Sequence, residues 1–515
     1  MKIAVLVLYA LMMVTVIVFT AKKSISLNDF LLGGRRVGPW MSALSYGTSY
    51  FSAVIIVGYA GSVGWKVGLS AVWAGIGNAL VGGLVAWALL AKPARVMGER
   101  LNVATVPSFF EKRYQSKTLK ILASLIIFVF LLPYSASVYK GLAIMFQKAM
   151  GFDYTWCVIG IALLASVYLF LGGYRATAVT DFIQGIIMLA GISFVVYYIV
   201  HGAGGLSAGL DALGNEAVTG GTGFNSLLPP KGQEIFLLSN VVLTSFGVLG
   251  MPHMIHKFFA IKEASAVKRA TIISTIFCLI IAGGAYFAGS FGHVVLNSIT
   301  NDAGQTLAST ITSKTVDTIM PSMLVDKTVV GMPDGLLGLI VVLLLSASVS
   351  TLTALVLSSS SVLSIDLIGT IFPKMDVKRT TLTMRILCVV FVLFSLAVNF
   401  LMQGTPIISL MSLSWGTIAG AFLAPFLYGL LWKGVTKIGV YAGVVCGLLI
   451  SLVPPLAAGD FSLSPVSGAS AMVAGLIIVP VVSALTKKWG FSDAHLQMVF
   501  GTKEQKTTGA AAAGN

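Results

Sequence analysis

The stretch Ser45-Tyr46-Gly47-Thr48-Ser49-Tyr50-Phe51-Ser52-Ala53 lies in the middle of an apolar segment that spans residues 39–64. Glycine weakens a helix, and backbone that leaves the helix at membrane depth is tolerated only beside a cavity or inside protein. A second stretch, Thr244-Ser245-Phe246-Gly247-Val248-Leu249-Gly250-Met251-Pro252, interrupts the segment 234–256 in the same way. Such small residues can also serve tight helix packing alone. The proline lacks a backbone donor, so the two stretches together predict two broken helices.

These two segments belong to a longer series of apolar segments, most of them about 20 residues long, which is enough for a helix to cross a bilayer core of about 30 Å. We predict thirteen membrane helices, at residues 3–20, 39–64, 69–91, 119–148, 154–174, 178–200, 234–256, 270–297, 335–365, 380–402, 406–431, 437–455 and 467–486. The second broken helix follows the first by five helices. That spacing is typical of an inverted five-plus-five repeat whose broken first helices form a binding site at the midplane.

The basic residues indicate how the helices are oriented. With the N-terminus outside, 26 of the 33 Lys and Arg residues fall in loops predicted to lie inside or in the cytoplasmic tail. Short basic loops stay cytoplasmic, so we expect a multi-pass protein of the cell (inner) membrane with its N-terminus outside and its C-terminus in the cytoplasm. The net charge of +15 is spread over these loops beside anionic headgroups, which gives no support for a nucleic-acid partner.

The chain is 57% hydrophobic and 10% charged, which excludes an ordinary soluble protein. We expect one transmembrane transporter domain over residues 1–488 and a cytoplasmic tail, 489–515, that is disordered at its end. The two longest outward loops, 201–233 and 298–334, are expected to be surface connections or short lids. The chain shows no nucleophile elbow, phosphate-binding loop or zinc motif, so neither an enzyme nor an ATP-driven pump is indicated.

Hydroxyl groups gather in the predicted helix 335–365. Seven serine and threonine residues lie in Ser346–Ser359. Ser350 and Thr351, with Ala347 one turn earlier, place neutral oxygen atoms on one helical face. A small hard cation such as Na⁺ prefers several oxygen donors, although Ser and Thr in membrane helices also bond to their own backbone.

Two of the charged residues in the predicted helices, Asp181 and Lys140, are notable for their positions. Asp181 is near the cytoplasmic start of the helix 178–200, where a carboxylate is either functional or favoured by the first helical turn. Lys140 is in the outer third of the helix 119–148 and either holds an anionic solute or extends to the outer surface. His253 and His256 are expected to cap the helix or to face the cytoplasmic interface.

Several motifs together resemble the sodium/solute symporter family over almost the whole chain, from Phe30 to Lys488. The matching motifs are Phe30–Arg35, Gly172–Ala176 leading into Val179–Gly185, Gly250–His253, the Ser350-Thr351 stretch and Gly429–Lys433. The resemblance implies a LeuT-like inverted repeat formed by the ten helices between 39 and 431, with one flanking helix before and two after. It also implies uptake of an organic solute driven by the Na⁺ gradient.

The resemblance also implies a sodium site. Its ligands would be the carbonyl oxygens of Thr48, Phe51 and Ala347 and the hydroxyls of Ser350 and Thr351. Some members bind a second sodium through the aspartate at the position of Asp181 and further hydroxyls. Thr353 fits that pattern, but Ala354 stands where the second hydroxyl would be. Proline-transporting members differ from this chain at Tyr50, Thr244 and Val248, which disfavours proline.

From the broken helices we expect the solute to bind between the two interruptions. Exposed helix ends there offer amide donors that suit a carboxylate. The predicted contacts are Ser49, Tyr50, Ser52, Ala53, Tyr134, Lys140, Thr244 and Phe246. The sequence thus predicts a sodium-coupled symporter for an organic acid or amino-acid-like solute that works as a monomer. The alternatives are a proton-coupled symporter of the same fold and a solute-binding membrane sensor.

Overall fold

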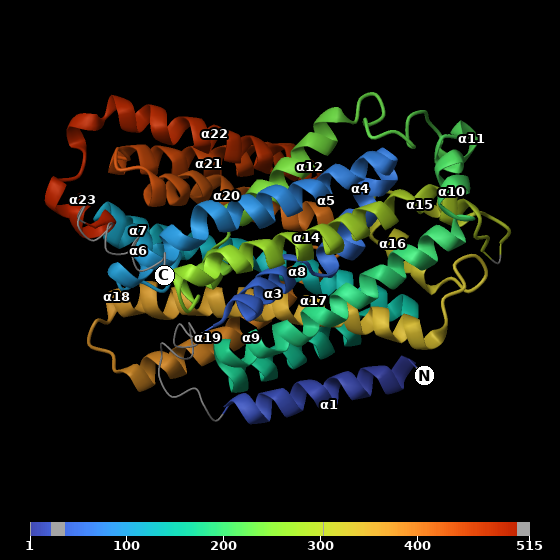
Figure 1. The fold of residues 1–515 in the computed structure, drawn as a ribbon, viewed down its shortest axis with the longest axis horizontal. Coiled ribbons are helices and arrows are strands. Elements are labelled where there is room, and N and C mark those ends of the chain that lie inside the picture. The colour runs from blue at the N-terminus through green and yellow to red at the C-terminus, as the bar shows by residue number, and fades with distance from the viewer. Residues whose placement is uncertain (1, 22–36, 302, 502–515) are drawn as a thin grey trace.

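The computed structural model describes residues 2–21, 37–301 and 303–501, and among these residues it is built from helices, with only isolated bridges. The motif Phe30–Arg35 lies outside the described residues. The long helices lie side by side (Figure 1). Nine of the described helices are long and apolar enough to cross a membrane, or ten if one bent pair counts as a single span. The exact number of thirteen remains a prediction.

The first predicted repeat corresponds to the segments between α3 and α9. The segments are α3 (Pro39–Tyr50), η2 (Val54–Tyr59), α4 (Ala60–Val67), η3 (Gly68–Ala71), α5 (Val72–Gly77), η4 (Asn78–Val85), η5 (Trp87–Ala91), α6 (Lys92–Arg100), α7 (Val106–Tyr114), α8 (Lys117–Met150) and α9 (Tyr154–Gly202). The turn between the predicted helices 39–64 and 69–91 is at Gly68, whose φ is 58°. A Cβ there would also clash with the carbonyl oxygen of Phe224, so the turn requires glycine.

One helix, α9, covers the two predicted segments 154–174 and 178–200. Its two ends nevertheless lie close together. The Lys2 ammonium bonds to the carbonyl of Ala149 just before α9 and pairs with Asp334, while Gly202 at the end of α9 lies against Val330. The chain therefore reverses direction within α9, which agrees with two antiparallel passes.

The second predicted repeat begins with a bent pair. It comprises α12 (Glu234–Gly247), η6 (Val248–Gly250), α13 (Pro252–Phe259), α14 (Val267–Ser290), α15 (Gly292–Asn297), α17 (Asp334–Ser361), η10 (Val362–Ile368), α18 (Gly369–Ile371), α19 (Val377–Leu401) and α20 (Ile407–Leu431). The flanking helices are α1 (Lys2–Ala21), α21 (Lys437–Ala458) and α22 (Ser464–Leu485). Helices α17 and α20 are almost completely buried by their neighbours, so they form the centre of the bundle.

The two long connections contain short helices. These are α10 (Leu206–Leu213), α11 (Glu216–Thr219), η8 (Leu307–Thr310), η9 (Val316–Thr318) and α16 (Ile319–Val325). They gather at the end of the bundle where α1 begins, which we call the outer end because the charge pattern predicts it outside (Figure 1). Helices α6, α7, α18 and α23 (Asp493–Phe500) lie at the opposite, inner end.

Part of the predicted tail packs on the bundle. The imidazole of His495 on α23 lies within hydrogen-bond distance of the Arg113 carbonyl, and the Arg100 guanidinium donates to the Val499 carbonyl. The tail predicted from residue 489 therefore contacts the bundle through α23, and the domain boundary at residue 488 stays a prediction. The end of the tail, 502–515, lies outside the described residues.

Candidate functional site

The first broken helix is interrupted where the sequence predicts it. Helix α3 ends at Tyr50, Phe51 has an extended backbone (φ −107°, ψ 123°), and helical structure resumes at Val54. The last carbonyl groups of a helix have no partner within it, and its C-terminal end carries partial negative charge. The break therefore places carbonyl oxygens that lack a partner within their own helix inside the bundle.

Helix α17 lies beside these carbonyls and presents its hydroxyls to them. The Ser350 hydroxyl donates to the carbonyls of Thr48 (2.8 Å) and Ala347 (2.9 Å). The Thr351 hydroxyl lies 3.4 Å from the Thr48 carbonyl, 3.3 Å from that of Ser49 and 3.0 Å from that of Ala347. All these residues are buried. Four of the five predicted sodium ligands thus converge, together with Ser49, which the prediction did not include as a sodium ligand.

The arrangement suits a monovalent cation. Its oxygens are neutral, and the hydroxyls that now donate to carbonyls can turn their lone pairs toward an ion. No cluster of three His, Cys, Asp or Glu side chains that could hold a metal is found among the described residues. For the fifth predicted ligand, the Phe51 carbonyl, no contact with this group is seen in the described structure; its ring stacks on Tyr50 at 4.4 Å.

The second interruption lies later than the middle of its segment. Helix α12 continues to Gly247, Met251 is extended (φ −81°, ψ 122°), and α13 starts at Pro252 with a bend of 45°. Pro252 at the first turn of α13 is favourable because its missing N–H would be unpaired there. The Thr244 carbonyl accepts a hydrogen bond of 2.6 Å from the Tyr50 hydroxyl, so the two broken helices are in direct contact.

Aromatic rings meet between the broken helices. The Trp415 ring on α20 lies 6.0 Å from that of Tyr50 and 5.7 Å from that of Tyr134 on α8. The Tyr134 ring lies 5.8 Å from the His253 ring on α13. These four side chains form what we call the central cluster. The sequence prediction included Tyr50 and Tyr134 but missed Trp415 and His253.

His253 does not face the cytoplasmic interface as expected. It is 1% exposed, and neither ring nitrogen has a hydrogen-bond partner among the described residues. The hydroxyl of Ser49 is likewise buried without such a partner. Buried polar groups are normally paired, so these two are candidates to bind a ligand. The position of His253 directly after the predicted break is the sequence feature that could have identified it as a site residue.

The remaining predicted solute contacts differ in position. Ser52 and Ala53 lie within the first break: the Ser52 hydroxyl accepts from the Val54 amide, and the Ala53 amide donates to the Ser348 hydroxyl. Phe246 is 36% exposed, whereas the neighbouring Thr244 is fully buried. Because successive helical residues point in different directions, Phe246 points away from the central cluster, and its assignment as a solute contact is not supported by this geometry.

Asp181 faces a lysine that the sequence prediction placed in a cytoplasmic loop. The Lys257 ammonium at the end of α13 lies 3.2 Å from the Asp181 carboxylate and 2.7 Å from the Ser45 hydroxyl, which also donates to Asp181. Asp181 and Lys257 are only 1% and 3% exposed. Thr353 instead donates to the Ser350 carbonyl within α17. In this conformation the lysine therefore supplies the positive charge beside Asp181.

In the described structure Lys140 is held inside the protein, and a contact with the solute stays a prediction. Its ammonium lies 3.0 Å from the carboxylate of Asp317 and also donates to the carbonyls of Gln403 and Thr405. It is 5% exposed, so it does not extend to the outer surface, and its charge is already neutralised. Sequence reasoning missed Asp317 because it lies in a loop that was expected to be at the surface.

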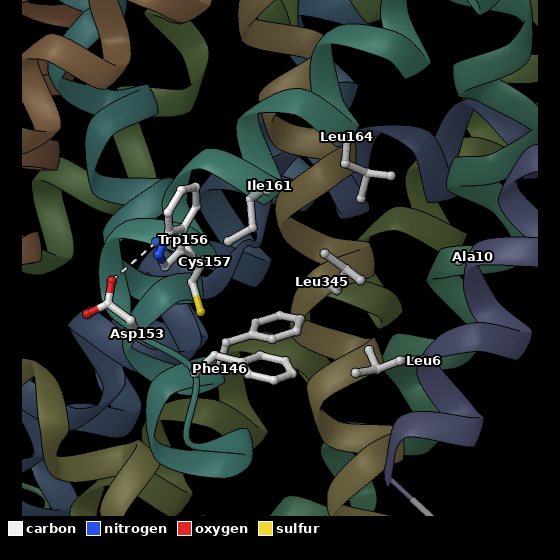
Figure 2. A pocket seen from close by; sticks show the side chains of 11 residues that line it. Leu6, Ala10, Phe146, Asp153, Trp156, Cys157, Ile161, Leu164 and Leu345 are labelled. Carbon is white, nitrogen blue, oxygen red and sulfur yellow. Dashed lines mark hydrogen bonds between the residues drawn. The ribbon is translucent and has the colours of Figure 1, made fainter.

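A cavity of about 470 Å³ lies away from these groups, on the outside of the bundle between α1, α8, α9 and α17. Figure 2 shows its side chains and the Asp153 carboxylate, which caps α9 by accepting from the Trp156 amide. Its described lining is otherwise almost entirely apolar. The lining comprises Leu6, Ala10, Phe146, Phe152, Asp153, Trp156, Cys157, Gly160, Ile161, Leu164 and Leu345. The cavity is suited to lipid chains rather than to a cation.

The comparison with known proteins now identifies the family. The model of the sodium:solute symporter family matches residues 30–447, and the chain belongs to this family. A sodium/proline symporter from Staphylococcus aureus is 30% identical over 501 residues, which cover 93% of this chain and 92% of that protein. The chain is therefore a multi-pass membrane transporter and not an enzyme.

Solved structures show the same fold. A Na⁺-coupled sialic acid symporter in a substrate-bound outward-open state superposes with a TM-score of 0.75 at 17% identity, covering 94% of this chain and 97% of that chain. Mhp1, a nucleobase-cation-symport-1 family transporter in a closed conformation, superposes with a TM-score of 0.53 at 16% identity, covering 93% and 99%. These neighbours have the LeuT fold, as the sequence predicted.

Proposed function

We propose that the protein imports a small organic solute together with Na⁺ by alternating access, and that the cation binds among Thr48, Ala347, Ser350 and Thr351. The observation that carries this proposal is the convergence of the two α17 hydroxyls on the carbonyls freed by the break after Tyr50. An ion bound there contacts both α3 and α17. It would therefore stabilise the conformations in which the two helices stay together, which is how binding energy biases a transport cycle.

We further propose that the solute binds at the central cluster. The rings of Tyr134 and Trp415 offer apolar faces, while the Ser49 hydroxyl and the His253 imidazole offer buried polar groups that lack partners in the described structure. A solute with a small apolar body and a polar or anionic end, such as an organic acid or an amino-acid-like compound, matches this combination. The difference at Tyr50 keeps proline disfavoured.

The proposal includes an orientation and an assembly state. The N-terminus would lie outside and the C-terminus in the cytoplasm of the inner membrane, because the basic loops are at the end that carries α6, α7 and α23. A monomer would be sufficient, since the proposed ion and solute sites are both formed by residues of one chain.

A thermal-shift experiment on purified protein tests the cation site without knowledge of the solute. Na⁺ should raise the thermal midpoint of the wild type relative to choline, because a ligand that binds only the folded state stabilises it. In Ser350→Ala and Thr351→Ala, a roughly tenfold higher Na⁺ concentration should be needed for the same rise in the thermal midpoint. This is the change expected for the loss of a cation ligand worth about 1.4 kcal/mol.

Ser360→Ala is the matched control. Ser360 is a buried serine of the same helix whose hydroxyl donates to the Val356 carbonyl, away from the break. Its Na⁺ response should equal that of the wild type. Unchanged Na⁺ responses in both the Ser350 and Thr351 variants would refute the site.

The same assay, run with a panel of organic acids and amino acids with and without Na⁺, identifies the solute. Stabilisation by the solute should be greater when Na⁺ is present. A solute response that is independent of Na⁺ but changes with pH would instead support the proton-coupled alternative.

A further inference from the structure

One segment of the outer end is buried in its central part. We call residues 303–333 the outer lid; it contains η8, η9 and α16 between α15 and α17. Within it, residues Ile319–Leu324 of α16 are buried, and Met320 packs on Gly61 of α4, where a Cβ would lie 3.3 Å from its side chain. The lid therefore inserts against the outer half of the first broken helix.

Asp317 attaches this lid to two other elements. Its carboxylate accepts from the Ile407 amide in the first turn of α20 (3.2 and 3.1 Å) and lies 3.0 Å from the Lys140 ammonium of α8. The N-terminal end of a helix favours a negative charge, so α20 and Lys140 both stabilise the ionised carboxylate. The side chains of Lys140 and Asp317 are only 6% and 1% exposed.

The lysine is bound as completely as the aspartate. Its ammonium also donates to the carbonyls of Gln403 (3.2 Å) and Thr405 (2.7 Å), in the connection that leads into α20. An ammonium group has three protons to donate, and these three acceptors use all of them. The lid, α8 and the start of α20 are thus held together by one buried network.

This network borders a cavity on the outer side of the central cluster. The cavity, about 270 Å³, is lined by Ser62 and Lys66 of α4, by Thr312 and Val316 of the lid, and by Ile408 and Ser409 of α20. Val316 and Ile408 are the chain neighbours of Asp317 and Ile407. We call this cavity the outer chamber.

Groups along α20 separate the outer chamber from the central cluster. Ile407 binds Asp317, the Ser412 hydroxyl lies 2.6 Å from the Tyr59 hydroxyl, and Trp415 belongs to the cluster. From Ile407 to Trp415 the helix rises about 12 Å. Movement of α20 away from the first broken helix would connect the chamber with the cluster, and it would pull Ile407 away from Asp317 unless the lid moved with it.

We propose that Lys140 and Asp317 form the ionic latch of an outer gate: their ion pair holds the outer lid and the start of α20 on α8, and it parts when the protein opens to the outside. Lys140 then acts on transport by controlling access rather than by contacting the solute. The inference rests on the proposed alternating-access function, but its test requires neither a solute nor Na⁺.

The test measures access to the outer chamber. Ser409, which is 2% exposed and lines the chamber, is replaced by cysteine in a protein whose native cysteines Cys157, Cys278, Cys388 and Cys446 have been substituted. A membrane-impermeant maleimide should label this cysteine slowly. Adding Asp317→Asn or Lys140→Met should raise the labelling rate roughly tenfold or more, within the usual range for coupled conformational equilibria.

A second reporter separates gating from loosened packing. Ser42→Cys, near the inner start of α3 and also buried, should be labelled no faster, or more slowly, in the same latch variants. The matched control is Lys327→Met, which removes an exposed ion pair with Asp334 (3.0 Å) at the end of the same lid. That substitution should leave both labelling rates unchanged.

Unchanged Ser409→Cys labelling in both latch variants would overturn the proposal. So would an equal rise at both reporters, because that result indicates a generally loosened bundle. Failure of the Na⁺ response with an intact latch effect would refute the sodium site and leave the latch standing.

Discussion

Replacing Lys257 with methionine should destabilise the protein, and neutralising Asp181 in the same chain should restore most of the loss. The two side chains are 4% and 1% exposed, with 3.2 Å between the ammonium and the carboxylate. Removal of one partner leaves an uncompensated buried charge, which costs about 3–5 kcal/mol. The double variant Asp181→Asn/Lys257→Met contains no such charge, so a coupling free energy of at least about 2 kcal/mol is expected.

The assay is a double-substitution cycle on thermal midpoints of purified protein. Both single variants should have clearly lower midpoints than the wild type. The double variant should be more stable than either single variant. Lys262→Met is the control, because it removes the neighbouring exposed pair with Glu263 (3.6 Å; 60% and 57% exposed), which is worth about 0–1 kcal/mol. If the losses of the two single variants simply add in the double variant, the ion pair is not an energetic unit and the reasoning fails.

The variant Lys257→Met also tests whether the Lys257 ammonium occupies the position of a cation. In the described structure, one carboxylate oxygen of Asp181 has no hydrogen-bond partner. Without the lysine, that carboxylate and the Ser45 hydroxyl offer oxygen ligands. Na⁺ should therefore stabilise Lys257→Met more than the wild type, by about 2.7 kcal/mol at a concentration 100 times its Kd. An equal Na⁺ response in both proteins would refute a cation position beside Asp181.

Two further outcomes are expected. His253→Ala should raise the KM for the solute identified by thermal shift roughly tenfold, because a buried hydrogen-bonding group is lost. Phe246→Ala should leave the KM unchanged. Equal effects of the two substitutions in uptake assays would show that His253 is not part of the site. Burial raises the pKa of the Asp317 carboxyl, and the Lys140 ammonium opposes this shift. Tyr154 is the other titratable group that interacts electrostatically with Asp317. The thiolate that reacts with maleimide becomes scarcer as the pH falls, so the rate for Ser409→Cys is divided by the rate for Ser409→Cys/Asp317→Asn at the same pH. This ratio should rise as the pH falls, starting above the usual range of an aspartate near 3.9, and a constant ratio would contradict the expectation.

The broken helices could be predicted because their cause is local. Glycine and hydroxyl residues at 45–53 weaken the helix within its own sequence, and the break at Phe51 lies inside that stretch. The hydroxyls of Ser350 and Thr351 could be assigned to one face for the same reason, since helical spacing alone places them there.

The partners of the buried lysines could not be predicted because they depend on distant parts of the chain. Lys140 and Lys257 each stand in apolar surroundings, whereas Asp317 and Asp181 belong to other elements. Counting charges by loop gave the right class of protein but placed Lys257 outside the bundle. The direction of Phe246 was equally inaccessible, because a segment that is apolar on all sides does not indicate which face turns inward.

The distribution of charge explains why a neutral cation site is suitable at the centre. In this conformation Lys140 and Lys257 are each neutralised by a carboxylate, one toward the outer end and one toward the inner end of the bundle. The Lys257–Asp181 pair stays electrically neutral if its two members move together across the membrane field. The oxygens of Thr48, Ala347, Ser350 and Thr351 carry no net charge, so a cation bound there adds its full charge to the moving part. Moving that charge through the field is worth about 2.3 kcal/mol per 100 mV. The membrane potential therefore acts on the proposed cycle through the ion and the solute rather than through the Lys257–Asp181 pair.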